Sequence, residues 1–196
     1  MEEIEVKFLN INPVEIENKL KKLGADRQFE RLYRRRVFDY PDLRLDKQGA
    51  WLRLRDEGDS IKLAFKQRIG MSNFDGKLND IGMEEIEIEV SDFDKTADIL
   101  LKSGLKEKFY QENKRIRYVF DNIEFDIDFW PKLDPYLEIE ATSWDDIDRG
   151  IKLLGLNPDD KKIFSTNRIY KLKGIEILDY KITTFERMVK GDNKMF

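Results

Sequence analysis

The sequence contains no cysteine and no histidine among its 196 residues. Without cysteine the chain cannot form a disulfide, a thiolate nucleophile or a zinc–thiolate site. Without histidine it lacks the side chain that most often serves as a general base and that commonly binds zinc. Any chemistry must therefore depend on carboxylates, lysine, arginine, tyrosine and a bound ion.

The chain also lacks a basic excess and a long apolar run. It has 36 Lys and Arg against 40 Asp and Glu, for a formal net charge of −4, whereas a protein that binds nucleic acid usually has a basic surface. No apolar run approaches the roughly 20 residues of a membrane-spanning helix. The N-terminal residues are acidic where a signal peptide would be basic. We therefore expect no nucleic-acid or membrane partner, and a cytoplasmic location.

Charge of both signs is abundant. Charged residues make up 39% of the chain and hydrophobic residues 40%, whereas about a quarter of an average soluble protein is charged. A chain of this length can bury a substantial core. We expect a single domain over residues 1–196, with its core over about residues 1–170 and a helical tail over about residues 171–196.

An internal repeat organises the sequence. Residues 3–24, 85–104 and 138–155 each begin with a Glu-apolar-Glu strand, continue into an amphipathic helix and end at a glycine. The first two repeats are each followed by an arginine-rich strand that ends in Phe-Asp. Alternate side chains of a strand point to opposite faces, so each of these strands has one charged and one apolar face. The pattern predicts a largely antiparallel α+β fold, with a loop over residues 69–82.

The charged strand faces allow two interpretations. A one-sided antiparallel sheet can expose such a face to solvent. Alternatively, the sheet closes into a barrel whose interior holds both charge signs, and such an interior needs a ligand because unpaired buried charges are costly. Rows of arginine and lysine suit phosphate oxygens, and carboxylates without histidine or cysteine suit Mg²⁺ or Mn²⁺. The second interpretation therefore describes a polyphosphate with its metal ion.

Residues 3–7, Glu-Ile-Glu-Val-Lys, resemble the ExExK signature of the CYTH, or triphosphate tunnel metalloenzyme, superfamily. This superfamily includes class IV adenylyl cyclases, thiamine triphosphatases and inorganic triphosphatases. Further motifs that match in the same order lie at residues 51–55, 63–66, 85–87, 115–117, 127–128 and 137–140. One ExExK match alone would be weak, whereas this ordered series over about residues 1–170 is specific. The resemblance implies an eight-stranded antiparallel β-barrel that forms a tunnel, with helices packed outside.

The resemblance also implies roles for individual charged residues. The carboxylates that would bind Mg²⁺ or Mn²⁺ are Glu3, Glu5, Asp128, Glu138 and Glu140. The cations that would bind the phosphates are Lys7, Arg53, Arg55, Lys66, Arg115 and Arg117. Catalysis would fall to Glu5, Lys7 and Glu138, with support from Glu85 and Glu87. Lys62 and Asp126 are expected to form structural ion pairs, and the phase of residues 34–36 is ambiguous, so no role is assigned to them.

The implied activity is divalent-metal-dependent hydrolysis of a triphosphate-containing small molecule, namely inorganic triphosphate, thiamine triphosphate or a nucleoside triphosphate. The cyclase branch carries a His-Phe pair before its ExExK motif, and this chain has no histidine. A class IV-type adenylyl cyclase that makes cyclic AMP and pyrophosphate from ATP stays open as an alternative. A non-catalytic module that binds polyphosphate or nucleotide is the second alternative. The sequence does not choose among the substrates, or between a monomer and a homodimer.

Overall fold

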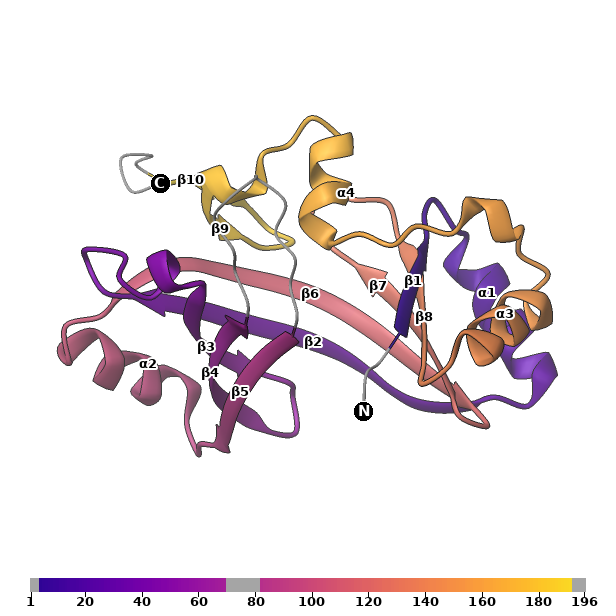
Figure 1. Ribbon diagram of the computed structural model, residues 1–196, viewed down its shortest axis with the longest axis horizontal. Helices are drawn as coiled ribbons and strands as arrows, with labels where there is room; N and C mark the ends of the chain where they lie inside the picture. The colour runs from indigo at the N-terminus through magenta and orange to yellow at the C-terminus, as the bar shows by residue number, and fades with distance from the viewer. Residues whose placement is uncertain (1–3, 70–81, 192–196) are drawn as a thin grey trace. The chain divides into compact units, whose positions relative to one another are not determined.

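The computed structural model describes residues 4–69 and 82–191 (Figure 1). Glu3 and nearly all of the loop predicted over residues 69–82 lie outside the described residues. The α-helices are α1 (Pro13–Leu23), α2 (Phe93–Lys102), α3 (Trp144–Leu153) and α4 (Thr166–Leu172). The strands are β1 (Ile4–Phe8), β2 (Asp26–Asp39), β3 (Ala50–Asp56), β4 (Ile61–Ile69), β5 (Gly82–Glu89), β6 (Lys106–Phe120), β7 (Ile123–Phe129), β8 (Tyr136–Ala141), β9 (Tyr180–Thr183) and β10 (Met188–Lys190). The predicted α+β class is therefore confirmed.

Eight strands form one continuous path in the order β1-β8-β7-β6-β2-β3-β4-β5. The prediction that this sheet closes into a barrel is wrong, because the path is open at β1 and β5. The outer edge of β1 is engaged elsewhere: the Lys7 backbone N–H donates to the Lys162 carbonyl (2.8 Å), and the Lys162 N–H donates to the Lys7 carbonyl (2.9 Å). These two bonds occupy backbone groups that closure of the sheet along β1 would require.

The chain forms two compact units. The first contains residues 1–32 and 113–178, and the second contains residues 33–112 and 179–196. The long strands β2 and β6 each begin in one unit and end in the other. The single domain expected from the sequence stays a prediction.

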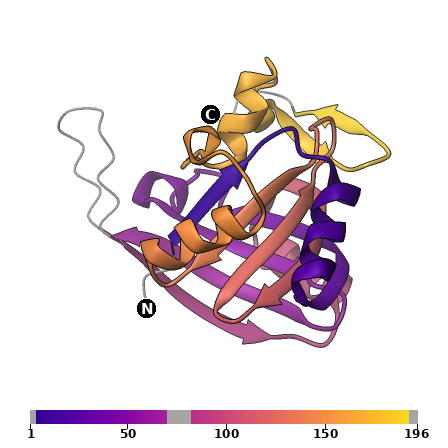
Figure 2. The same ribbon diagram turned by 90° about the vertical axis from the view of Figure 1, so that its right-hand side faces the viewer.

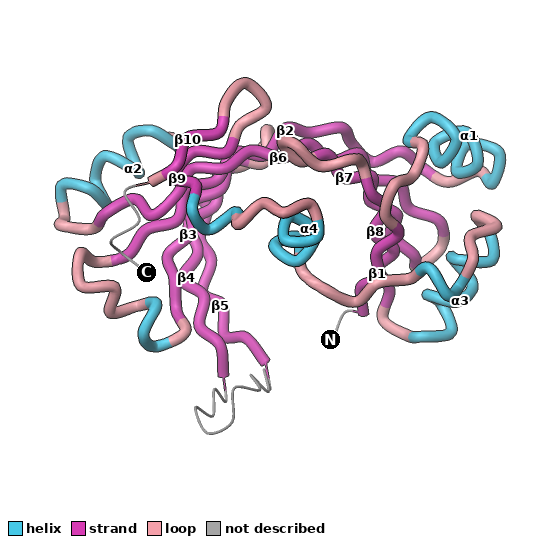
Figure 3. The backbone as a smooth tube through the Cα atoms, turned by 90° about the horizontal axis from the view of Figure 1, so that it is seen from above, coloured by secondary structure: helices cyan, strands magenta, loops and turns pink. Residues whose placement is uncertain are grey.

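The first unit buries the apolar faces of its strands against α1 and α3. These helices lie on one side of β1, β7 and β8, as Figure 2 and Figure 3 show, whereas α4 lies on the other side. Val6, Leu20, Ile139 and Ile147 are completely buried in this core. Since core residues alternate with charged residues along each strand, this packing fixes which face of the strands carries the charge.

Both ends of α1 have residues that commonly cap helices. The Asn12 side chain accepts hydrogen bonds from the backbone N–H groups of Val14 (3.0 Å) and Glu15 (3.3 Å). Pro13 is the first helical residue, and Gly24 ends the helix at φ +77°, where a side chain would be strained. The helix therefore has a fixed length and presents one apolar face to the strands.

The second unit has its own core around α2. Phe38 and Leu54 from β2 and β3 are completely buried, and Phe93 and Ala97 of α2 pack in the same cluster. The strands β3, β4 and β5 pair antiparallel in sequence order. The face of these strands opposite the core residues therefore carries the charged side chains.

The C-terminal segment differs from its predicted helical form. After α4, the chain forms a 3₁₀ turn (Ile177–Asp179) and the short strands β9 and β10, which pair antiparallel. Strand β9 also pairs parallel with β6, where Ile182 lies opposite Tyr110 and Thr183 lies opposite Gln111. The edge of β6 supplies the backbone partners that favour a strand here. No helix in the described ranges is long and apolar enough to cross a bilayer.

Candidate active site

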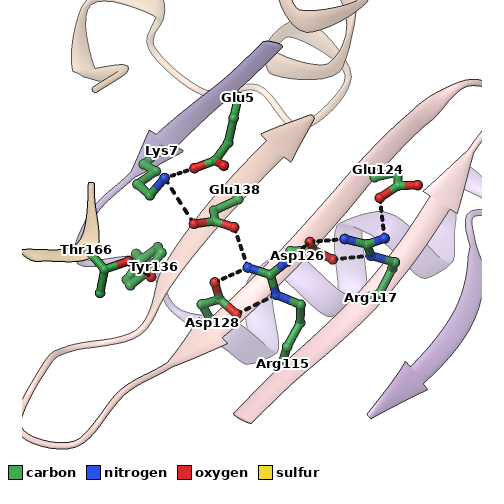
Figure 4. Close-up of polar contacts among 10 residues, drawn as sticks. All are labelled: Glu5, Lys7, Arg115, Arg117, Glu124, Asp126, Asp128, Tyr136, Glu138 and Thr166. Atoms are coloured by element: carbon green, nitrogen blue, oxygen red, sulfur yellow. Dashed lines mark hydrogen bonds and ion pairs between the residues drawn. The ribbon is translucent and has the colours of Figure 1, made fainter. Parts of the chain in front are cut away.

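The charged face of the first unit is built from four neighbouring strands, shown in Figure 4. In the register of β1, β8, β7 and β6, residues that lie directly opposite one another form two charged rows. One row consists of Glu5, Glu140 and Glu124, and the next consists of Lys7, Glu138, Asp126 and Arg117. The site therefore contains carboxylates and cations at the spacing of adjacent strands, about 4.8 Å.

Three glutamates in one row form the most acidic part of this face. Glu140 lies directly opposite both Glu5 and Glu124, and like charges in that arrangement are destabilising. One carboxylate oxygen from each of Glu124, Asp126 and Glu140 lies within 4.8 Å of the others. Carboxylate oxygens are hard donors that suit Mg²⁺ or Mn²⁺. The chain has no cysteine or histidine that could add a thiolate or imidazole ligand.

Arg115 lies at the centre of a buried carboxylate cluster. Its Nε and Nη2 atoms donate to the two oxygens of Asp128 at 2.7 and 2.6 Å, which is a bidentate pair. Its Nη1 donates to Asp126 (2.6 Å), and its Nη2 also donates to Glu138 (2.5 Å). Asp126 and Asp128 are each 1% exposed, so these bonds compensate two fully desolvated acids.

The pKa values of the acids in the buried cluster are shifted in opposite directions. The pKa of Asp128 is raised to about 7, because burial and, to a smaller extent, the negative charge of Glu138 outweigh the lowering effect of Arg115. Burial also opposes the charge on Glu138, but Arg115 and Lys7 lower the pKa of that carboxyl below its usual value. Burial likewise opposes the Arg115 charge, and the surrounding acids nevertheless raise its pKa. Near neutral pH, Glu138 is therefore ionised and Asp128 can hold a proton.

Lys7 and Arg117 lie at the two ends of one charged row on this face. The Lys7 Nζ contacts Glu5 and lies 3.1 Å from the Glu138 Oε1. The Arg117 Nε and Nη2 donate to Asp126 at 2.7 and 2.6 Å, and its Nη1 contacts Glu124. Both cations are thus held by acids from their own or neighbouring strands.

The second unit has a separate charged cluster on β3, β4 and β5. The Arg53 Nη2 lies 3.3 Å from Glu85 and 3.5 Å from Glu87. The Lys66 Nζ lies 2.8 Å from Glu85, and the Lys62 Nζ lies 3.1 Å from Glu87. The two glutamates therefore fix the positions of three cations.

Burial and neighbouring cations both act on the charged groups of this second cluster. Burial lowers the pKa of Arg53, and the positive charge of Arg55 lowers it further. Burial lowers the pKa of Lys66, with an added contribution from Arg53. The Nε atoms of Arg53 and Arg55 are buried and have no hydrogen-bond partner among the described residues. Buried donors without acceptors cost free energy, which an anionic ligand would relieve.

The structure places the predicted site residues in two groups. The first unit brings together Glu5, Lys7, Arg115, Arg117, Asp128, Glu138 and Glu140, and the second unit brings together Arg53, Arg55, Lys66, Glu85 and Glu87. Glu3 lies outside the described residues. Asp128 and Glu138, expected as metal ligands, bind Arg115. Asp126 forms the ion pairs expected of it, and it also belongs to the acidic cluster.

Two residues of these clusters have no predicted role. Glu124 belongs to the acidic cluster, and Glu57 contacts Arg55 in the second unit. Glu124 has the same strand parity as Asp126 and Asp128, so alternation alone could have identified it. Glu57 lies just after the end of β3, where strand alternation gives no signal.

Comparisons with solved structures show the fold. A conserved hypothetical protein from Pyrococcus furiosus aligns with a TM-score of 0.63 at 20% identity, over 86% of this chain and 99% of that chain. A protein from Vibrio parahaemolyticus, described as a candidate adenylate cyclase, aligns with a TM-score of 0.62 at 17% identity, over 86% of this chain and 97% of that chain.

A third similar structure is from Hippeastrum. That protein is described as a candidate adenylyl cyclase with a dominant triphosphatase activity. It aligns with a TM-score of 0.56 at 15% identity, over 88% of this chain and 95% of that chain. No curated protein matches the chain. The CYTH domain model matches residues 1–177, and the chain therefore belongs to the CYTH domain family.

Proposed function

We propose that this protein uses a divalent metal ion, Mg²⁺ or Mn²⁺, to hydrolyse the terminal phosphoanhydride of a small triphosphate-containing substrate. The observation that carries the proposal is the row of Glu5, Glu140 and Glu124 across three adjacent strands, beside the cations Lys7 and Arg117. Three carboxylates in a row favour a bound cation, and the neighbouring cations favour an anion. A metal–phosphate complex supplies both charges.

The residues best placed for the metal ion are Glu124, Asp126 and Glu140, with Glu5 next to Glu140 in the register. When bound there, the ion would neutralise negative charge on the phosphate oxygens. In the free protein, Arg117 neutralises Glu124 and Asp126 instead. We propose that the Arg117 guanidinium leaves these carboxylates and binds a phosphate oxygen when metal and substrate enter.

Each unit offers cations for phosphate oxygens. In the first unit these are Lys7, Arg115 and Arg117, and in the second unit they are Arg53, Arg55 and Lys66. The arginines can form bidentate hydrogen bonds with phosphate, whereas the lysines act as point charges. Because acids on neighbouring strands already hold most of these cations in place, little reorganisation is needed when charge develops on the phosphate.

The hydrolytic step requires an attacking water and a group that accepts its proton. Water attacks the terminal phosphorus while the bond from that phosphorus to its bridging oxygen breaks, and the shortened phosphate leaves with the bond's electron pair. Glu5 is the best proton acceptor on this face, since its side chain keeps 40% exposure and contacts Lys7. The two oxygens of Glu138 are engaged by Lys7 and Arg115, so Glu138 positions these cations.

Hydrolysis is preferred over cyclisation for two reasons. The chain has no histidine, and the related fold from Hippeastrum is described with a dominant triphosphatase activity. The test is to incubate the protein with tripolyphosphate, thiamine triphosphate or ATP in Mg²⁺, Mn²⁺ or Ca²⁺, and to identify the products. We expect orthophosphate from at least one triphosphate. Cyclic AMP and pyrophosphate from ATP would instead indicate a cyclase, and thermal stabilisation by tripolyphosphate without turnover would indicate a binding module.

A further inference from the structure

We propose that Arg35 of β2 is an additional phosphate-binding residue, which increases the preference of the second unit's cation cluster for a triphosphate over a diphosphate. This inference rests on the proposed function. It adds Arg35 to the site. Strand alternation gave no role to this residue, because Arg34, Arg35 and Arg36 are consecutive and the phase of their strand is ambiguous in the sequence.

The register of β2 with β3 resolves the phase. Arg35 lies directly opposite Arg55, and Val37 lies directly opposite Arg53. Residues that are directly opposite in an antiparallel pair share a face of the sheet. Arg35 therefore lies on the same face as Arg53 and Arg55, the face that carries the cation cluster.

Arg34 and Arg36 lie on the opposite face and have structural partners there. The Arg34 Nε donates to Asp56 (3.1 Å), and the Arg36 Nη2 donates to Asp94 of α2 (3.0 Å). Their guanidinium carbons lie 5.0 and 5.2 Å from the centroid of the Phe93 ring. These two arginines join β2 to the side of the sheet that α2 covers, so their substitution serves as a control for Arg35.

Arg35 extends a row of cations across three strands. Arg35 lies opposite Arg55, and Arg55 lies opposite Lys62. With adjacent strands about 4.8 Å apart, the row is roughly 10 Å long. Like charges directly opposite one another are destabilising in the free protein. Glu57 contacts Arg55, and Glu57 and Glu87 lie 3.8 and 3.1 Å from the Lys62 Nζ, so these acids compensate part of the row. An anion that lies against the row would add further compensation.

The chemistry of neighbouring groups indicates which anion. The Nε of Arg55, the residue directly opposite Arg35, is buried and has no hydrogen-bond partner among the described residues. Two adjacent guanidinium groups present several N–H donors with the fork geometry that phosphate oxygens match. Burial is the main cause of the lowered pKa values of Arg53 and Lys66 on this face, and neighbouring arginines add to it. Because each added phosphoryl group brings further negative charge, Arg35 favours the longer phosphate chain.

The test compares Arg35→Gln with Arg36→Gln, which removes one positive charge from the same strand but from the opposite face. Isothermal titration calorimetry in EDTA measures the binding of tripolyphosphate and of pyrophosphate without turnover. We expect Arg35→Gln to weaken tripolyphosphate binding about ten- to thirtyfold, the effect of one charge-assisted hydrogen bond. Pyrophosphate binding should weaken less than about threefold, and Arg35→Lys should recover part of the tripolyphosphate affinity because it keeps the charge.

Unfolding in urea separates binding from a structural role. Arg36→Gln should lower the stability of the ligand-free protein, because it removes the ion pairs with Asp94 and Glu107. The affinities of the two variants are compared under conditions in which both are folded. Equal losses of affinity in the Arg35 and Arg36 variants, or an unchanged affinity in Arg35→Gln, would overturn the inference. Wild-type protein that binds tripolyphosphate but hydrolyses no triphosphate would contradict the proposed function alone. Wild-type protein that binds no tripolyphosphate would overturn both.

Discussion

Glu124 of β7 lies directly opposite Glu140 of β8, and one carboxylate oxygen of each lies within 4.8 Å of the other. Glu5 of β1 lies opposite Glu140 on its other side. A stable sheet rarely places three like charges in one cross-strand row without compensation. Arg117 compensates this row in part by its contact with Glu124. This relationship leads to predictions for metal binding, for stability and for catalysis.

Glu140→Gln is expected to remove the stabilisation that a bound metal ion gives. With Mn²⁺, wild type should gain thermal stability through binding, and Glu140→Gln should lose most of that gain. Thermal unfolding with and without Mn²⁺ measures the gain in each protein.

The matched control for this prediction is Glu15→Gln. Glu15 is an exposed residue of α1 in the same unit, and its Oε1 lies 2.9 Å from the Lys19 Nζ at the surface. The control should retain the Mn²⁺-dependent stabilisation. If Glu140→Gln retains it to the same extent, Glu140 is not a metal ligand.

Arg115→Gln is expected to destabilise the protein severely. The substitution leaves Asp126, Asp128 and Glu138 buried without their shared cation, and the loss of one partner from a buried ion pair costs about 3–5 kcal/mol. Urea unfolding at pH 8 measures the loss. Arg149→Gln, which removes a more exposed arginine from α3, should cost much less. Equal costs for the two variants would show that the buried cluster does not depend on Arg115.

The metal-free protein is expected to lose stability as the pH rises from about 5 to about 8. The folded state keeps the Asp128 proton up to about pH 7, whereas the unfolded state releases it near the usual pKa of 3.8. Between these values the folded state binds more protons, so a rise in pH shifts the equilibrium toward unfolding. Glu138 affects stability at lower pH. Because folding lowers the pKa of Glu138, its contribution to stability is present above pH 4.5, the usual pKa of a glutamate, and is lost as the pH falls below that value.

Asp128→Asn provides the check on this pH dependence. The variant has no proton to release at position 128, so its free energy of unfolding should vary much less between pH 5 and pH 8. The measurement is urea unfolding in EDTA across this range. A wild-type protein that becomes more stable toward pH 8 would contradict the proton on Asp128.

Strand alternation in the sequence was sufficient to predict the charged faces. It placed Glu5, Asp128 and Glu138 opposite the apolar core, because the packing of α1 and α3 leaves only one face for charge. Alternation is a local property, and it does not determine which residues of two strands lie opposite each other. For that reason the partnership of Glu124 with Glu140, and the face of Arg35, emerged only from the register.

Features that depend on pairing between backbone segments far apart in the chain also could not be predicted from the sequence. The open path of the sheet follows in part from the pairing of Lys7 with Lys162, two residues far apart in the chain. The C-terminal strands form because Ile182 and Thr183 find the edge of β6. Local composition suggested a helix there, and the availability of a strand edge outweighed that preference.

The most direct test of the central claim is the rate of orthophosphate release from tripolyphosphate in wild type, Glu140→Gln and the control Glu15→Gln, each with Mg²⁺ or Mn²⁺ and with EDTA. The account predicts metal-dependent release in wild type and Glu15→Gln, and a loss of at least about a hundredfold in Glu140→Gln, which is the scale of removing one strong transition-state contact. Metal-dependent release at the wild-type rate from Glu140→Gln would contradict it.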